Sequence, residues 1–328
     1  MTKTAIVILN YNGRAYLEKF LPGVIKYSKD ATVIVADNAS TDDSVAFLEA
    51  NHPEVQLIIL DENHGYAGGY NEALKQIEAE YYLLLNSDVE VTPDWINPLV
   101  SFLDSNPEYA ACQPKIKDYN HRALFEYAGA SGGFIDSLGY PYCRGRIFDE
   151  LEADSGQYND PIDIFWSSGA CMLIRSEVFF NARGFDQDFF AHMEEIDLCW
   201  RIQSMGMKIR AIPAATVYHV GGGTLNKSSS FKTYLNFRNG LSLLIKNLPL
   251  PHLILKFPIR IFLDWLAALK FILEGSFNHA TAVLKAHFYI LSYSIKTLKK
   301  RKNTSATPQS MMVVFEYYVK KKRKFSDF

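Results

Sequence analysis

Four strongly apolar runs near the start of the chain each end in polar side chains, and this repeat constrains the fold more than any other feature. The runs are rich in β-branched, leucine and tyrosine residues, which is typical of buried strands, and the segments between them have the apolar spacing of helices. Strands that are apolar on both faces and alternate with helices predict an α/β fold with a mostly parallel sheet and flanking helices. Strands are expected at 5–10, 31–38, 55–63 and 81–88, and helices at 14–28, 40–51 and 69–80.

The polar clusters that end these runs are expected to lie close together. In a parallel sheet the carboxyl ends of the strands meet at one edge, where α/β proteins bind their ligands. No GxxxxGK[ST] motif occurs, and the turn NYNGRA after the first run lacks the glycines of GxGxxG, which disfavours ATPases and NAD-dependent dehydrogenases. The clusters are Asn10 to Asn12, Asp37 to Ser40, Asp61 to Asn63 and Asn86 to Asp88.

Two carboxylates at these strand ends are candidate ligand contacts. Asp37 stands where it could accept a hydrogen bond from a nucleobase imide, although an Asp-, Asn- and Ser-rich loop also suits helix capping. Asp88 follows a very apolar run, where a carboxylate needs a cation or several donors to offset its desolvation. A divalent metal ion that holds a substrate diphosphate would satisfy Asp88, whereas a turn residue is the structural alternative.

The stretch NHGYAGGYN, residues 63–71, places three glycines before an expected helix. Glycine lets the backbone approach a ligand closely, and the free N–H groups at a helix start attract phosphate. Glycines before helices are also plain turn residues, so the stretch is a weak indication of a ligand-binding loop. The three residues are Gly65, Gly68 and Gly69.

Charge divides the chain into two parts. The totals of 34 Lys/Arg and 36 Asp/Glu nearly cancel, but residues 1–239 hold 19 and 32 of them, whereas residues 240–328 hold 15 and 4. We therefore expect an acidic α/β domain over residues 1–239 and a basic region over residues 240–328. Four cysteines without a CxxC pair argue against a zinc knuckle or a disulfide framework and suit a reducing cytosol. The apolar run at the N-terminus is too short for a signal peptide.

The basic region has apolar residues at helical spacing, at positions 254, 257, 261, 265, 269 and 272. Charged residues interrupt every run before it is long enough to span a bilayer, and Pro258 is expected to begin or kink a helix. One interpretation is a helical appendage packed on the α/β domain. The other, which we favour, is a set of amphipathic helices that lie on an anionic membrane surface at the cytoplasmic face. Nucleic acid is disfavoured, because the body is acidic and no recognition motif occurs.

Residues 165–224 add a small-residue turn, a GFD turn, an acidic pair that opens a helix, and a strand that ends in His219. Together with VILNYNG, VADNAST, the glycine stretch and LLLNSDVEV, these ordered motifs resemble family 2 glycosyltransferases of the GT-A fold, especially the bacterial rhamnosyltransferase-like members. The resemblance covers about residues 4–240. It implies an inverting, metal-dependent enzyme that moves a sugar, rhamnose among the possibilities, from a nucleotide-diphosphate donor to a hydroxyl of a cell-surface glycan or lipid-linked acceptor.

The resemblance also implies roles for single residues. Asp88 and His219 would hold Mg²⁺ or Mn²⁺ across the donor diphosphate, although His219 could instead be a core residue. Asn86 and Ser87 belong to the DxD-type motif, in which Asn86 offers an amide where many relatives have a carboxylate. Arg238 would reach the diphosphate, with a surface role as the alternative. The implied donor contacts are Asn10, Asp37, Asn38, Gly68, Gly69, Asn71, Asn86, Ser87, Asp88 and Arg238.

The acidic pair Glu194 and Glu195 matches the family's catalytic pair, with Glu195 as the general base that takes the proton of the acceptor hydroxyl. Acidic residues in the first turn of a helix are also favoured by its dipole, so at least one carboxylate of this turn is expected to be structural. Asp197 is the best candidate for that role, because Arg201 follows four residues later. The implied acceptor contacts are Trp166, Ser168 and Gly169, for which simple packing is the alternative.

Two other classes of protein fit part of the pattern. A sugar nucleotidyltransferase has a similar α/β sheet, but it requires a glycine-rich basic loop where this chain has NYNGRAY. A non-catalytic subunit that binds a sugar nucleotide would keep the donor residues and lack turnover. A transfer assay that compares the protein with Glu195→Gln separates all three.

Overall fold

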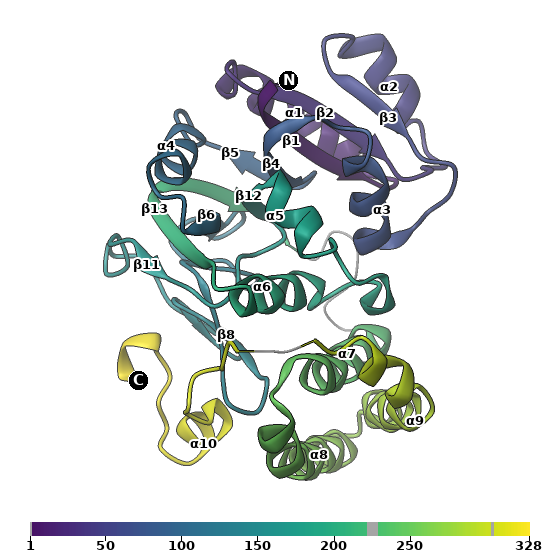
Figure 1. The fold of residues 1–328 in the computed structure, drawn as a ribbon, viewed down its shortest axis with the longest axis vertical. Coiled ribbons are helices and arrows are strands. Elements are labelled where there is room, and N and C mark those ends of the chain that lie inside the picture. Colours follow the sequence, from purple (N-terminus) through teal and green to yellow (C-terminus); the bar gives the residue numbers. More distant parts are fainter. Residues whose placement is uncertain (1, 222–228, 303–304) are drawn as a thin grey trace.

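The computed structural model describes residues 2–221, 229–302 and 305–328, and its centre is a mixed sheet of nine strands (Figure 1). The strands of this sheet are β1 (Thr2–Asn10), β2 (Thr32–Asp37), β3 (Gln56–Ile59), β4 (Ala79–Asn86), β5 (Val89–Val91), β6 (Tyr109–Asp118), β11 (Ile162–Asp163), β12 (Cys171–Arg175) and β13 (Lys208–His219). Their order is β11-β13-β6-β12-β4-β1-β2-β3, and β5 pairs with β13. The four strands expected from the apolar runs are all present, and they pair in parallel.

The register of these four strands brings their polar ends to one edge. Asn10 lies opposite Asp37 on the neighbouring strand, and Leu9 lies opposite Asn86. The predicted sheet with parallel central strands and flanking helices is confirmed, and antiparallel strands adjoin it: β12 runs antiparallel between β4 and β6, and β5 and β11 run antiparallel to β13. These strands belong to segments without the alternation of apolar runs and helices on which the prediction rested.

The side chains of β1 alternate between two hydrophobic cores, one on each face of the sheet. Ala5 and Val7 face one side of the sheet, and Ile6 and Ile8 face the other, because successive side chains of a strand point in opposite directions. Residues of α1, α2 and α4 fill the second core, and residues of α3, α5, α6 and α7 fill the first. These helices are α1 (Arg14–Tyr27), α2 (Ser44–Asn51), α3 (Gly65–Leu74), α4 (Asn97–Ser105), α5 (Ser176–Asn181), α6 (Glu194–Ser204) and α7 (Ser230–Asn247).

Helix α3 begins earlier than expected. It starts at Gly65, so Gly68 and Gly69 lie within its first turns and not in a loop before it. A Cβ atom on Gly69 would lie 2.9 Å from the side chain of Leu9 on β1, and one on Gly68 would lie 2.8 Å from the Cβ of His64. Gly69 therefore permits close packing of helix and sheet, and Gly68 makes room for His64 at the start of the helix, so these positions belong to the helix and not to the predicted glycine loop before it.

A second, four-stranded sheet lies beside the main one, in the order β10-β9-β8-β7. It comes from the segment between β6 and β12, and the C-terminal segment packs on it through Phe325, which contacts Phe134 and Tyr142. The remaining short elements of this part are β7 (Gly133–Ile135), β8 (Pro141–Cys143), β9 (Arg146–Ile147), β10 (Glu150–Leu151), α10 (Val313–Tyr318) and a 3-10 turn, η2 (Phe325–Asp327).

The basic region is helical, as expected. Helices α8 (Leu250–Leu273) and α9 (Phe277–Lys299) follow α7, and α9 packs against both (Figure 1). Pro258 lies inside α8. The boundary expected after residue 239 falls within α7, so the α/β part and the helical part share this helix. Within the described ranges, none of the helices is both long and apolar enough to cross a membrane.

Candidate active site

Asp88 and His219 come together because two strands pair at the edge of the sheet. Strand β5 runs antiparallel to the end of β13, so Val89 lies opposite His219, and the N–H of Val220 donates to the carbonyl of Asp88 at 3.0 Å. This pairing brings Oδ1 of Asp88 to 3.1 Å from Nε2 of His219. Asn86, at the end of β4, lies 3.4 Å from the same nitrogen. Asp88 and His219 are both buried.

A third acidic residue, Glu126, faces the other nitrogen of the same imidazole. Its Oε1 lies 3.3 Å from Nδ1 of His219. Burial alone would lower the pKa of His219, but the charges of Glu126 and Asp88 overcome burial and raise it to about 10. The sequence offered no signal for Glu126, because it belongs to a segment without a recognisable motif, and only the fold brings it to His219.

These residues fit a divalent cation held together with a substrate. No group of three or more His, Cys, Asp or Glu side chains arranged to hold a metal ion occurs among the described residues. Magnesium sites, however, commonly use one or two protein ligands and complete the coordination with substrate phosphates and water. A carboxylate on the second nitrogen of a metal-binding histidine is the usual supporting contact, and Glu126 stands in that place. Asp88 and His219 would therefore be the protein ligands, and His219 would release the proton of its Nε2 when the ion binds.

Glu194 and Glu195 open helix α6 and line the same cavity as Asp88 and His219. The cavity has a volume of about 210 Å³. The Oε2 atoms of both glutamates are buried, and neither has a hydrogen-bond partner in the part of the chain that the structure describes. Burial raises the pKa of Glu195 to about 7 and the pKa of Glu194 well above its usual range. The site thus holds two carboxylates whose neutral forms are favoured by burial.

His192 also lines the cavity, and the sequence motifs did not indicate it, although it lies two residues before Glu194. Burial and the nearby charge of Lys232 lower the pKa of His192 to about 4, so its imidazole is neutral near pH 7. Its Nε2 is buried without a hydrogen-bond partner among residues 2–221, 229–302 and 305–328. His192 and Met193 have positive φ angles of 69° and 70°, which is a strained backbone for residues with side chains.

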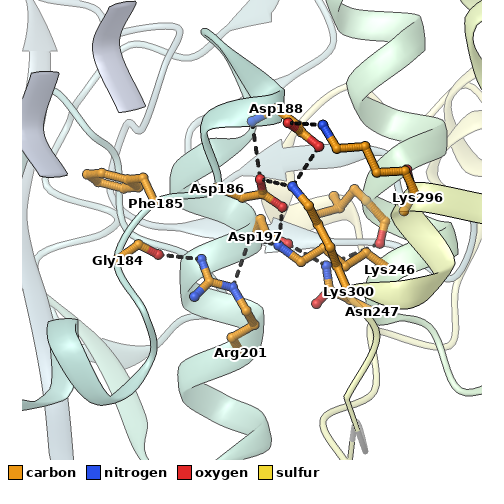
Figure 2. Close-up of polar contacts among 12 residues, drawn as sticks. Gly184, Phe185, Asp186, Asp188, Asp197, Arg201, Lys246, Asn247, Lys296 and Lys300 are labelled. Atoms are coloured by element: carbon orange, nitrogen blue, oxygen red, sulfur yellow. Dashed lines mark hydrogen bonds and ion pairs between the residues drawn. The ribbon is translucent and has the colours of Figure 1, made fainter. Parts of the chain in front are cut away.

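Asp197, in the first turn of the same helix, has the opposite surroundings (Figure 2). It is fully buried, and its oxygens accept hydrogen bonds at 2.8 Å from Arg201, Lys246 and Asn247. Burial opposes ionisation, but the charges of Arg201 and Lys246 outweigh it and lower the pKa of Asp197. The expectation of a structural Asp197 paired with Arg201 is confirmed.

The loop before α6 is held in place by α7. Arg238 donates to the carbonyls of Phe189 at 2.6 Å and Asp188 at 3.1 Å, and the Nδ2 of Asn239 contacts the carbonyls of Phe189, Ala191 and His192. Arg238 is buried and does not line the cavity of Asp88 and His219. Its contacts correct the expectation that it reaches a donor diphosphate: it secures the strained loop that places Glu194 and Glu195.

A smaller cavity of about 120 Å³ adjoins the first one at Tyr66, Asn86 and Asp88. Ser87 lines it, together with residues of the turn after β1. Beneath this turn, Oδ2 of Asp37 accepts a hydrogen bond from Nδ2 of Asn10 at 2.9 Å. Asp37 and Asn10 are almost completely buried, so they lie one layer below the cavity wall.

Of the other predicted contact residues, some line the larger cavity and others contact only the interior of the protein. Ser168 and Gly169 line the larger cavity, and the carbonyl of Gly169 accepts a hydrogen bond from the hydroxyl of Tyr66 at 2.8 Å. Three others make internal contacts. Asn38 joins the loops after β2 and β3, Asn71 exchanges two hydrogen bonds with the backbone of Phe185, and Trp166 is buried against Gly133 and donates to Phe134. None of these three lines the cavity that holds Asp88 and Glu195.

Comparison with known proteins agrees with this geometry. A family model described as Glycosyl transferase family 2 matches residues 5–180, more than half of the chain. An N-acetylglucosaminyl-diphospho-decaprenol L-rhamnosyltransferase of Mycobacterium tuberculosis is 26% identical over 238 residues, which is 65% of this chain and 75% of that protein. Rhamnosyltransferase WbbL of Escherichia coli is 23% identical over 222 residues, or 65% of this chain and 82% of that protein.

Solved structures share the fold. A mannosyltransferase from Pyrobaculum calidifontis, in complex with GDP-Man and Mn²⁺, has a TM-score of 0.54 at 15% identity and covers 90% of this chain and 80% of that one. GalNAc-T7 with UDP, GalNAc and Mn²⁺ has a TM-score of 0.57 at 16% identity and covers 74% of this chain. This chain spans 48% of the length of GalNAc-T7.

Proposed function

The chain belongs to glycosyl transferase family 2, and from this premise we propose that it transfers a sugar from a nucleotide-diphosphate donor to a hydroxyl of a lipid-linked or cell-surface glycan, with inversion. The chain is thus a transferase enzyme, and rhamnose is the first sugar to test because two relatives are named rhamnosyltransferases. One observation supports the proposal most. Asp88, the pair Glu194 and Glu195, and His219 come from three separate segments of the sequence and line a single cavity.

The donor would lie across the two adjoining cavities, with its base in the smaller one and its diphosphate near Asp88 and His219. A bound Mg²⁺ or Mn²⁺ would neutralise the diphosphate and the charge that develops on the leaving oxygen. Asp88 and His219 would hold this ion, while Glu126 orients the imidazole. Asn86 and Ser87 would add neutral hydrogen-bond donors, and Asn10 and Asp37 would support the wall of the base pocket from below.

Glu195 would act as the general base. Its Oε2 would take the proton from the acceptor hydroxyl while the hydroxyl oxygen bonds to the anomeric carbon and the bond from that carbon to the diphosphate breaks, its electron pair leaving with the diphosphate oxygen. A base works best when its pKa lies near the working pH, and burial raises the pKa of Glu195 to about 7. Ser168 and Gly169 would line the acceptor side of the cavity.

We propose an acceptor that carries a lipid diphosphate, by analogy with the relative named for N-acetylglucosaminyl-diphospho-decaprenol. Such an acceptor and a nucleotide-sugar donor would meet at the cytoplasmic face of the membrane. The four cysteines are free and buried, which suits a reducing compartment.

The test is a transfer assay with a panel of radiolabelled donors, namely dTDP-rhamnose, UDP-hexoses and UDP-galactofuranose, each with Mg²⁺ or Mn²⁺ and an N-acetylglucosaminyl-diphospholipid. We expect one donor to raise the melting temperature and to label the lipid, and Glu195→Gln to keep the thermal shift and lose the transfer. Synthesis of a sugar nucleotide from a nucleoside triphosphate and a sugar phosphate would instead identify a nucleotidyltransferase. A thermal shift without turnover in the parent protein would identify a non-catalytic subunit.

A further inference from the structure

Helix α8 buries an arginine and an aspartate together with Leu253 and Ala268, and it exposes many of its large apolar side chains. Its buried positions include Arg260 and Asp264, which are 3% and 0% exposed. Its outward positions are large and apolar, and several are more than half exposed, with Ile254 at 69% and Leu273 at 79%. Surface helices in water normally bury their apolar stripe and expose their charges. The six residues that we call the α8 apolar face are Ile254, Leu255, Phe262, Trp265, Leu269 and Leu273.

The charged residues of α8 are held firmly inside. Arg260 donates to Asp264 at 2.8 Å and to the carbonyl of Leu138 at 3.1 Å, and its guanidinium lies 3.9 Å from the centre of the Tyr140 ring. A Cβ atom on Gly240 would lie 2.9 Å from this guanidinium, so the glycine on α7 makes room for it. Burial of an ion pair has a desolvation cost that a simple amphipathic helix avoids. The contacts fix α8 in one orientation, with its apolar side away from the protein.

Helix α9 extends the exposed apolar surface. Phe288, Leu291 and Ile295 recur at three- and four-residue spacing on α9 and are 67%, 76% and 69% exposed. Helix α8 lies at the end of the molecule opposite α2 and β3, with α9 beside it (Figure 1). Scattered apolar side chains are normal on protein surfaces, whereas apolar faces on two adjacent helices mark an interaction surface.

The charge around this surface favours an anionic partner. Residues 240–328 hold 15 Lys/Arg and 4 Asp/Glu, and Lys285, Lys299 and Lys302 are exposed. Among the acidic residues, Asp264 is turned inward, Glu316 is paired with two lysines, and Glu274 at the end of α8 lies 3.7 Å from Lys270. Apolar side chains beside lysines are what an interfacial helix presents to anionic lipid, with its axis in the plane of the membrane.

We propose that the α8 apolar face, extended by α9, inserts into the interface of an anionic lipid bilayer. The six side chains would enter the boundary between headgroups and acyl chains, and the lysines would contact the lipid phosphates. The inference concerns a surface outside the candidate active site, and its test uses neither donor nor acceptor. Its failure is therefore distinguishable from a failure of the proposed enzymatic function.

Trp265 provides a direct probe, because it is 49% exposed whereas Trp95, Trp166 and Trp200 are buried. The full chain is mixed with vesicles of phosphatidylcholine alone, or of phosphatidylcholine with phosphatidylglycerol, and tryptophan emission is recorded with and without brominated lipid. We expect a blue shift and quenching with the anionic vesicles, a weaker response at high salt, and no response in Trp265→Phe. An emission spectrum that stays unchanged with anionic vesicles would overturn the proposal.

Phe262→Asp and the matched Ile59→Asp separate lipid binding from a general effect of a new charge, because the two residues are 61% and 58% exposed and only Phe262 lies on α8. Co-sedimentation with anionic vesicles should weaken by about tenfold or more in Phe262→Asp, since the burial of one phenylalanine is lost. Ile59→Asp should bind as the parent protein does. If light scattering instead finds a dimer that Phe262→Asp dissociates, without vesicle binding, a second copy of the chain covers this face and the lipid proposal is wrong.

Discussion

Two groups of carboxylates lie within residues 186–197 and differ in their contacts, because three aspartates form ion pairs with lysine and arginine side chains and two glutamates line a cavity. Asp186, Asp188 and Asp197 are paired with Lys246, Lys296, Lys300 and Arg201 in the network of Figure 2. Glu194 and Glu195 lie between them in sequence and line a cavity, and the Oε2 atom of each is buried without a hydrogen-bond partner among the described residues.

The comparison teaches that position at a helix start does not by itself separate structural from functional acidic residues. Asp197 and Glu194 are both buried in the first turn of α6, yet the cations lower the pKa of Asp197 and burial raises that of Glu194. The paired group fixes the helix, and the group in the cavity is available for chemistry.

The largest effect is expected for Glu195→Gln. Loss of a general base typically reduces turnover by about a hundredfold to ten-thousandfold, and the amide preserves the size of the side chain. Burial raises the pKa of Glu195 in the folded protein to about 7, so the folded state favours the neutral side chain. Ionisation of Glu195 therefore lowers the free energy of unfolding as pH rises through about 7. The variant should therefore melt at a higher temperature than the parent at pH 8 and show little difference at pH 4. Initial transfer rates and calorimetry measure both effects.

Removal of a cation from the paired group should affect stability first. Lys246 is buried and contacts Asp186 at 2.7 Å and Asp197 at 2.8 Å, so Lys246→Met leaves the buried Asp197 and the partly buried Asp186 short of one partner. We expect a loss of about 3 kcal/mol in the free energy of unfolding, the lower end for a broken buried pair, since Arg201 and Lys300 remain. Urea unfolding measures the loss. Unchanged stability would contradict the structural role of this group.

Glu126 is an intermediate case, since its partner is the proposed metal ligand His219. Glu126→Gln keeps the shape but weakens the contact that orients the imidazole, and such changes usually reduce metal affinity by about tenfold to a hundredfold. Titration of Mn²⁺ in the presence of the nucleoside diphosphate of the active donor would measure the change. Equal affinities in the two proteins would place Glu126 outside the metal site.

The smallest effect is expected at the rim of the paired group. Lys296 contacts Asp188 at 2.9 Å, but its side chain is 57% exposed. Exposed ion pairs contribute little, so Lys296→Met should change the free energy of unfolding by about 0.5 kcal/mol or less. A loss as large as that of Lys246→Met would show that burial does not distinguish the members of the network.

Many residues at the edge of the sheet that carries the candidate active site could be predicted from local sequence patterns. Apolar runs that end in polar residues located Asp37 and Asp88, because parallel strands place such ends at one edge. The i, i+4 spacing of Asp197 and Arg201 predicted their ion pair. The family resemblance, and not spacing, suggested His219, and the pairing of β5 with β13 explains its contact with Asp88.

Other features depend on tertiary contacts that a local pattern does not contain. Glu126 reaches His219 only because the segment after β6 folds back along the sheet. Arg238 points to the carbonyls of the loop before α6, which no spacing in its own helix indicates. The spacing of apolar residues in the α8 segment predicted an amphipathic helix. The direction in which its apolar side faces is set by the contacts of Arg260 with Asp264 and Leu138.

The pH dependence of transfer tests the central claim most directly, because it reports whether a buried carboxylate in the cavity is the base. The logarithm of kcat/KM should rise with pH with a slope of one and level off above a pKa of about 7, the value that burial gives Glu195. Activity would thus be lost as pH falls through 7, when the base becomes protonated. A profile that stays flat down to about pH 5, the behaviour of an ordinary glutamate, would contradict the account.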